Sequence, residues 1–226
     1  MKYKGILLDI DNTLYAYDQC HEISIRRVFQ YLKENIQVEN IENIYTEAKR
    51  IVHIELAETA SSHNRLLYFQ KMCEILKLNP FAYALELYNI YWDSFLGSMK
   101  VFDGVEDFFN KVSSSTKICF VTDLTAHIQY RKINSLGLFQ YVDYIVTSEE
   151  VGKEKPHPYM FLSALKKLNL QSNEVCMIGD NFKKDIIGAS LLGIKSIWLN
   201  REGKQEVYNQ SCITEVKNFR SILEFV

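Results

Sequence analysis

KGILLDIDNTL, residues 4–14, begins as an apolar run and ends in two carboxylates, Asp9 and Asp11, one residue apart. No polar residue interrupts residues 6–8, a pattern typical of a strand buried on both faces of a parallel sheet. The carboxylates then fall at the carboxyl end of this strand, where open parallel sheets bind ligands. Because two close carboxylates repel each other, the pair favours a cation or a shared proton. An Asx-rich turn without any ligand is the alternative.

The composition excludes several classes of protein. The chain has 226 residues, enough for one domain with a large insertion or for two small domains. Its net charge of −2 gives no general attraction to nucleic acid or to an anionic membrane. The five scattered cysteines form no C-x-x-C pair, which indicates reduced thiols in a cytoplasmic protein. A strand so near residue 1 leaves no room for a signal peptide, and no apolar run is long enough to span a bilayer.

Residues 21–97 show helix signals and no convincing strand. Apolar residues recur at helical spacing in four segments, which predicts a small bundle of amphipathic helices. Ser61 and Ser62 are expected to cap the third helix, and Pro80 suits the first turn of the fourth.

From Val101 onward, predicted strands alternate with predicted helices. The strands are expected at residues 117–121, 144–146, 175–178 and 195–199, and the helices at 105–112, 126–136, 159–168, 185–192 and 216–225. Such alternation predicts an α/β fold: a Rossmann-like parallel sheet with helices on both faces. We therefore expect a core of residues 1–15 and 100–226, interrupted by an inserted helical cap of residues 16–99.

Each strong apolar strand is followed by a group suited to phosphate or metal. These groups are Asp9 and Asp11 after the first strand, Thr122 and Asp123 after the second, Lys155 in the loop after the third, and Asp180 and Asp185 after the fourth. Because the carboxyl ends of parallel strands meet at one edge of the sheet, we expect them to converge. The carboxylates suit Mg²⁺, and the lysine and hydroxyl suit the oxygens of a phosphate.

These residues resemble four motifs of the haloacid dehalogenase-like superfamily, in the subgroup with a helical cap inserted after the first strand. The matching segments, in order, are Asp9 to Leu14, Phe120 to Asp123, Lys155 to Pro158 with Phe161, and Ile178 to Asp185 followed by Gly188-Ala189. The resemblance covers nearly all of the predicted core. Four motifs in the right order, each at the end of a predicted strand, are far more specific than any one of them.

The resemblance implies a mechanism. Asp9 would attack phosphorus to give an aspartyl-phosphate, and Asp11 would protonate the leaving oxygen and then activate water. The carboxylate of Asp9, the backbone carbonyl of Asp11 and the side chain of Asp180 would bind Mg²⁺. An acid at position 11 favours phosphoryl transfer over dehalogenation, because halide leaves without a proton.

The resemblance also implies supporting roles. Thr122 and Lys155 would hold the oxygens of the transferring group, and Asp185 and Asn181 would support the metal and the lysine. Asp123 matches a position where the family often has Asn and is assigned to phosphate binding with them. A carboxylate there repels a phosphate unless it is paired or turned away.

The implied activity is hydrolysis of a small soluble phosphomonoester, such as a sugar phosphate or a nucleotide, by a monomer or homodimer. A phosphomutase and a non-catalytic phosphometabolite-binding or regulatory protein are the alternatives. Lys153 is a weaker candidate for the catalytic lysine than Lys155, which precedes a proline. His21 could contact substrate, and the cluster His63-Asn64-Arg65 could read a distal group, although a solvated helix start is the favoured interpretation of the cluster. The cluster is therefore left out of the predicted site.

Overall fold

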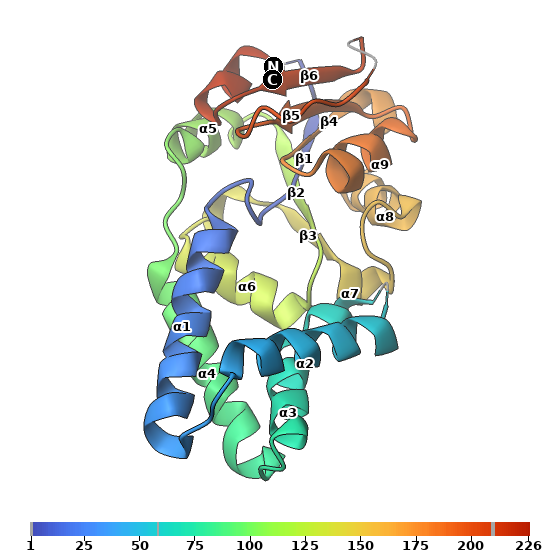
Figure 1. Cartoon of the computed structure of the whole chain (residues 1–226). Helices are drawn as coiled ribbons and strands as arrows, with labels where there is room; N and C mark the ends of the chain where they lie inside the picture. The colour runs from blue at the N-terminus through green and yellow to red at the C-terminus, as the bar shows by residue number, and fades with distance from the viewer. Residues whose placement is uncertain (1, 58, 209–210) are drawn as a thin grey trace. The chain divides into compact units, whose positions relative to one another are not determined.

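The computed structural model describes residues 2–57, 59–208 and 211–226. Its contacts divide the chain into two compact units. Unit 1 comprises Met1–Ala16 and Lys100–Val226, and unit 2 comprises Tyr17–Met99. Figure 1 shows strands in unit 1 and helices in unit 2. Within the described ranges, no helix is long and apolar enough to cross a bilayer.

Unit 1 is built on a six-stranded sheet in the order β3-β2-β1-β4-β5-β6, and every neighbouring pair is parallel. The strands are β1 Gly5–Leu8, β2 Lys117–Thr122, β3 Tyr144–Thr147, β4 Val175–Gly179, β5 Lys195–Leu199 and β6 Ile213–Val216. Leu8 of the central β1 is in register with Phe120 of β2 and Ile178 of β4. The residues that follow these three positions therefore leave the sheet at one edge.

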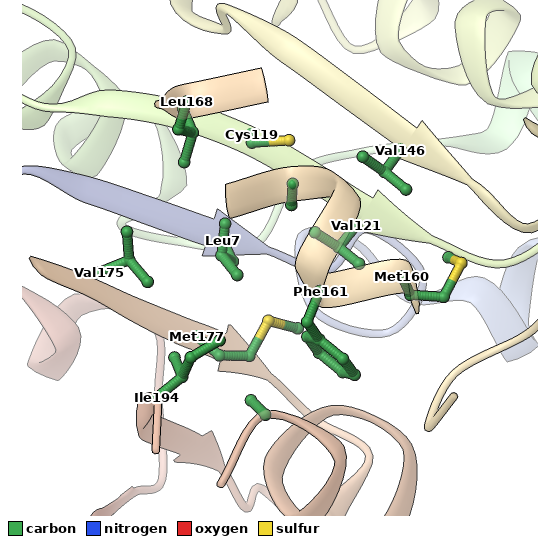
Figure 2. Close-up of a cluster of buried hydrophobic side chains, with 12 residues drawn as sticks. Leu7, Cys119, Val121, Val146, Met160, Phe161, Leu168, Val175, Met177 and Ile194 are labelled. Atoms are coloured by element: carbon green, nitrogen blue, oxygen red, sulfur yellow. The ribbon is translucent and has the colours of Figure 1, made fainter. Parts of the chain in front are cut away.

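The two faces of the sheet are covered by different helices. Leu7, Cys119, Val121 and Met177 pack with Phe161 of α8 (Pro158–Leu168) in one buried cluster, which Figure 2 shows. Side chains alternate between faces along a strand, so Phe120 points the other way. There it meets Phe109 of α5 (Val105–Val112), with the ring centroids 6.3 Å apart.

The predicted α/β fold class is confirmed, although several element boundaries differ. The remaining helical elements of unit 1 are α6 Ala126–Ser135, η2 Phe139–Tyr141, α7 Ser148–Val151, η3 Ser172–Glu174, η4 Phe182–Ile187, α9 Gly188–Ser190 and η5 Arg220–Glu224. The helix expected at residues 185–192 begins earlier, as the π-helix η4, and passes into the short α9. The final helix expected at 216–225 is wrong. Ile213 and Thr214 are β-branched residues and pair with β5 as part of β6, which ends at Val216. The described chain after β6 then forms only the short 3₁₀ helix η5.

Unit 2 contains the four expected helices: α1 Tyr17–Ile36, α2 Ile41–Glu55, α3 Arg65–Ile75 and α4 Pro80–Ser98, with a short 3₁₀ turn η1 at Ala60–His63. Helix α4 packs against α1 and α3, and α2 packs against α3. Pro80 opens α4 as predicted. The predicted serine caps of α3 are wrong: Asn64 caps it by accepting a hydrogen bond from the backbone N–H of Leu66 (2.9 Å), and the serines lie in η1.

Candidate functional site

Asp9 follows β1 directly and is buried in contact with a lysine and a threonine. Its Oδ1 accepts a hydrogen bond from Nζ of Lys155 at 2.5 Å, and its Oδ2 accepts one from Oγ1 of Thr13 at 2.8 Å. Lys155 is buried as well and also donates to Oδ1 of Asp185 at 2.6 Å. One ammonium group thus bridges two carboxylates that come from different strand ends.

The end of β4 contributes the other acids. Thr13 Oγ1 lies 3.1 Å from Oδ1 of Asp180 and thereby ties Asp180 to Asp9. One oxygen each from Asp9, Asp180 and Asp185 lies within 4.8 Å of the others. This triad is the only group of three or more such ligands found among the described residues. The side chain of Asp11 lies outside it.

Burial sets the electrostatics of this acidic triad. Burial raises the pKa of Asp9 and of Asp180 to about 7, and that of Asp185 to about 6. Burial opposes the charge on Lys155, but its attraction to Asp185 and Asp9 is stronger and raises the pKa of that lysine. With all three acids ionised, one lysine leaves two negative charges uncompensated. Close carboxylate oxygens with an excess charge of −2 match the donor set and the charge of a hard divalent cation such as Mg²⁺.

Asp11 is held by a different set of donors. Nζ of the fully buried Lys132 lies 2.7 Å from Oδ1 and 2.8 Å from Oδ2 of Asp11. The hydroxyl of Tyr15 donates to Oδ1, and Nε2 of Gln129 lies 3.4 Å from Oδ2. The two carboxylates of the first motif therefore differ in partners: Asp9 lies against Lys155 and the other acids, and Asp11 lies against helix α6.

The carboxyl end of β2 places Thr122 and Asp123. The buried Thr122 hydroxyl accepts a hydrogen bond from Nε2 of Gln129 at 2.7 Å. Asp123 accepts from the backbone N–H of Lys155 at 2.9 Å and from Nζ of Lys184 at 2.8 Å. Burial raises the pKa of Asp123, but the attraction of the two lysines outweighs it and lowers that pKa overall. Asp123 is thus the paired carboxylate that this position requires.

Asn181 lies at the start of η4 and organises the turn after β4. Its side chain accepts a hydrogen bond from the backbone N–H of Lys184 at 3.0 Å, and its own N–H donates to Oδ2 of Asp185 at 3.0 Å. Arg201, after β5, donates to the backbone oxygens of Asn12 and Thr13 at 2.5 and 3.0 Å. These bonds fix the backbone of the segment after β1.

The structure therefore brings Asp9, Lys155, Asp180 and Asp185 into direct contact or close approach. Asp123 is hydrogen-bonded to the backbone N–H of Lys155, and Thr122 and Asp11 both accept from Gln129. Sequence reasoning missed Thr13, Gln129, Lys132, Lys184 and Arg201. Gln129 and Lys132 carried a usable signal, because they lie three residues apart on one face of a predicted helix. Both are fully buried, which identifies that face of α6 as the inward one.

The chain is similar to known proteins of one family. The family profile described as haloacid dehalogenase-like hydrolase matches residues 6–199. Ribulose-1,5-bisphosphate 5-phosphatase of Halopiger xanaduensis is 33% identical over 85% of this chain and 83% of the relative. Glyceraldehyde 3-phosphate phosphatase of Methanopyrus kandleri is 26% identical over 90% and 87%. The structure of YfnB from Bacillus subtilis bound to magnesium shares the fold, with a TM-score of 0.74 at 21% identity over 99% and 98% of the two chains. The predicted family is confirmed: the chain belongs to the haloacid dehalogenase-like hydrolases.

Proposed function

We propose that the protein is a Mg²⁺-dependent phosphatase that hydrolyses a small phosphomonoester through an aspartyl-phosphate on Asp9. The observation that carries this proposal is the buried Asp9 carboxylate, held by Lys155 and Thr13 beside Asp180 and Asp185. The relatives named as phosphatases of ribulose-1,5-bisphosphate and glyceraldehyde 3-phosphate support the reaction class and a small phosphorylated metabolite as substrate.

In the first step, an oxygen of Asp9 attacks phosphorus and the bond from phosphorus to the ester oxygen breaks. The leaving oxygen takes a proton from Asp11, so the alcohol departs neutral. Asp9 is suited to attack because Lys155 and Thr13 fix its orientation with bonds of 2.5 and 2.8 Å.

In the second step, Asp11 takes a proton from water as the water oxygen attacks the phosphorus of the acyl phosphate. Inorganic phosphate leaves and Asp9 is regenerated. Because Asp9 and Asp11 have separate partners, one carboxylate serves as nucleophile while the other moves protons.

Charge neutralisation is the main demand on the rest of the site. Lys155 and the Thr122 hydroxyl hold the oxygens of the transferring group. Asp123 acts indirectly, since its carboxylate is paired with Lys184 and with the backbone of Lys155. It therefore sets the position of the lysine and has no free charge to repel the substrate.

The metal site would use Asp9, Asp180 and the backbone carbonyl of Asp11, with Asp185 and Asn181 supporting it. Bound Mg²⁺ would offset the negative charge that otherwise keeps the Asp9 carboxylate away from a phosphate dianion. Asp185 has a second task, because it shares Lys155 with Asp9 and fixes the lysine between them.

We assign unit 2 the role of a cap that admits small substrates and excludes water during the reaction. A cytoplasmic location fits the cysteines, because none of them forms a disulfide in the described part of the chain. A monomer or homodimer remains the expectation for the assembly.

The test is phosphate release from a panel of sugar phosphates and nucleotides, with Mg²⁺ and with a chelator, for wild type and Asp9→Asn. We expect wild-type release that needs Mg²⁺, and a loss of at least about a thousandfold in the variant, because the nucleophile is gone. Asp103→Asn is the matched control. Asp103 is an exposed acid of the same unit, and its carboxylate pairs with the exposed Arg220.

Full activity of Asp9→Asn would show that Asp9 is not the nucleophile. Transfer of phosphate between positions of one sugar, without net release, would identify a phosphomutase. Mg²⁺ binding with no turnover across the panel would favour a binding or regulatory protein.

A further inference from the structure

Gln129 of α6 is a fully buried side chain that lies beside Asp11 and the end of β2. Its Nε2 is 2.7 Å from Oγ1 of Thr122, 2.7 Å from the backbone oxygen of Asp123 and 3.4 Å from Oδ2 of Asp11. One amide group therefore joins the proposed phosphate-binding hydroxyl to the carboxylate that is proposed to move protons. All of these contacts lie within unit 1.

The neighbours of this amide decide which way round it lies. The backbone oxygen of Asp123 and the carboxylate of Asp11 only accept hydrogen bonds, so the NH2 group must face them. The other end of the amide, Oε1, is buried and has no hydrogen-bond partner in the described part of the chain. A buried acceptor without a partner lowers stability. The chain therefore carries this glutamine at a cost, which indicates that its two N–H donors are needed.

The two short bonds of Gln129 use both of its N–H donors. An amide NH2 group has two hydrogens, and the oxygens of Thr122 and Asp123, each at 2.7 Å, take one hydrogen each. The contact of 3.4 Å to Asp11 is weaker and has to share one of them. Asp11 depends little on this contact, because Lys132 donates to both of its oxygens at 2.7 and 2.8 Å. The main effect of Gln129 thus falls on Thr122 and the backbone beside it.

The bond from Gln129 turns the Thr122 hydroxyl into a donor. A hydroxyl can rotate to donate or to accept, but here one of its lone pairs is occupied by an N–H of Gln129. The hydroxyl proton must therefore point away from that N–H. Its acceptor in the structure is the backbone oxygen of Asp123 at 3.3 Å, which is long for a bond between a hydroxyl and an oxygen. A proton held so weakly is readily given to a closer acceptor.

We propose that Gln129 is a positioning residue of the phosphatase site, and that it fixes the Thr122 hydroxyl as a hydrogen-bond donor to an oxygen of the transferring phosphoryl group. A phosphate dianion offers only acceptors, so a hydroxyl that turns its lone pairs toward the dianion repels it. The inference rests on the proposed function, in which Thr122 holds an oxygen of that group. It gives α6 a part in phosphate binding through a residue that need not touch the substrate.

The test is a double-mutant cycle between Gln129 and Thr122, measured as kcat/KM for the best substrate of the panel with Mg²⁺. Gln129→Met keeps the length of the side chain and removes its donors, and we expect it to lower kcat/KM about tenfold or more. Thr122→Val removes the hydroxyl and keeps the branched shape. In that background Gln129→Met should change kcat/KM by less than about twofold, because no hydroxyl is left to orient. In a Thr122→Ser background, which keeps the hydroxyl, the loss should persist.

Gln140→Met is the matched control, because Gln140 is an exposed glutamine of the same unit. This variant should leave kcat/KM unchanged. Equal losses from Gln129→Met in wild type and in Thr122→Val would overturn the proposal, since they would show that Gln129 acts through Asp11 or through packing alone.

Binding of inorganic phosphate separates this inference from the activity. Calorimetric titration with phosphate in the presence of Mg²⁺ repeats the cycle without turnover. Gln129→Met should weaken phosphate binding about fivefold or more in wild type and leave it unchanged in Thr122→Val. This coupling in a protein that hydrolyses no substrate would reject the phosphatase and keep the role of Gln129. Turnover by wild type without the coupling would reject the role of Gln129 and keep the phosphatase.

A spectroscopic measurement covers the case in which Gln129→Met does not fold. When Thr122 donates to phosphate, its oxygen becomes a stronger acceptor, because the bonds of a hydrogen-bonded chain polarise one another. Phosphate should therefore shift the side-chain N–H resonance of Gln129 that faces Thr122 downfield in wild type, and it should not do so in Thr122→Val. No shift in wild type at saturating phosphate would overturn the proposal, and so would the absence of any phosphate binding by wild type.

Discussion

Asp11 accepts hydrogen bonds from a buried lysine, and this contact bears on both of its proposed roles. Lys132 reaches both oxygens of Asp11, and Tyr15 donates to one of them. While it is so engaged, the carboxylate has no proton to give to a leaving oxygen. The proposed acid step therefore requires a protonated oxygen of Asp11 that is not bonded to Lys132.

We predict that Lys132→Met lowers kcat by about tenfold or more and changes KM by less than about threefold, because it disturbs proton transfer and leaves substrate binding intact. Stability should fall by about 1–3 kcal/mol, less than for a fully buried pair because the Asp11 side chain is 24% exposed. Steady-state kinetics and urea unfolding measure the two effects.

The control for this variant is Lys167→Met. Lys167 pairs with Glu150 on the surface, where the two side chains are 30% and 47% exposed. Such a pair contributes less than about 1 kcal/mol, and it touches none of the acids of the site. An unchanged kcat in Lys132→Met would show that Asp11 needs no support from α6.

At this scale, sequence could predict the residues that end strands and could not predict those that approach from helices. Asp9 and Asp180 follow apolar runs and Lys155 lies in the loop after a third, so their place at the sheet edge follows from the pattern of the sheet. Lys132 looks like an ordinary helix lysine. The Lys132 side chain turns inward because of the way α6 packs. This packing brings Lys132 to Asp11, which lies more than one hundred residues earlier in the chain.

Among the elements, the junction of β4 and η4 decides the geometry of the acidic triad. Gly179 ends β4, and a Cβ built there would lie 2.3 Å from Oδ2 of Asp185. Asn181 then begins the π-helix by accepting the backbone N–H groups of Asp185 and Ile186 at 2.8 and 3.4 Å. The wide turn returns Asp185 toward the strand end, where it meets Lys155.

We predict that Gly179→Ala displaces Asp185, because an added methyl group cannot occupy the position of its carboxylate. Destabilisation of about 1–3 kcal/mol is expected from the overpacking, together with weaker Mg²⁺ binding and lower activity from the loss of the Lys155 contact. Thermal unfolding and calorimetric titration with Mg²⁺ give the two measurements.

Gly97→Ala is the matched control for this substitution. Gly97 lies in helix α4, and apart from its chain neighbours and the adjacent backbone of that helix, no described atom lies within 4 Å of a Cβ built on it. Alanine should stabilise that helix by about 0.5–1 kcal/mol and leave Mg²⁺ binding unchanged. Retention of wild-type Mg²⁺ affinity in Gly179→Ala would mean that Asp185 has no part in the metal site.

The elements also show where periodicity is informative and where it fails. Long amphipathic helices such as α1 and α4 were predictable because many turns repeat the same pattern. The region after β5 was not, because Val216 fits both an edge strand and an amphipathic helix, and only the pairing of β6 with β5 distinguishes them. The capping of α3 was missed because serine and asparagine are both good caps, and Asn64 is the one whose side chain reaches the helix.

For the whole molecule, the sheet order places the site on strands that are far apart in the sequence. β1 lies between β2 and β4, so the acids after β1 and β4 become neighbours only when residues 5–8 insert between segments more than one hundred residues further along the chain. The hydrogen bonds of Thr13 and of Lys155 join the end of β1 to segments that follow other strands. The three acids of the triad repel one another at the same place. The free energy of unfolding of unit 1 should therefore depend on the cation that offsets this repulsion.

We predict that Mg²⁺ stabilises the protein against thermal unfolding, by about 2.7 kcal/mol when free Mg²⁺ is one hundred times its dissociation constant, because the acids are gathered only in the folded state. Chelation should reverse the effect, and scanning calorimetry over a Mg²⁺ series measures it.

Asp180→Asn should abolish most of the increase in stability, whereas Asp103→Asn should retain it. Asp180→Asn is also expected to be as stable as wild type, or more so, without Mg²⁺, because it removes one of the repelling charges from the triad. An equal Mg²⁺ effect in Asp180→Asn would place the cation elsewhere and would leave the repulsion among the three acids to be relieved by protons alone.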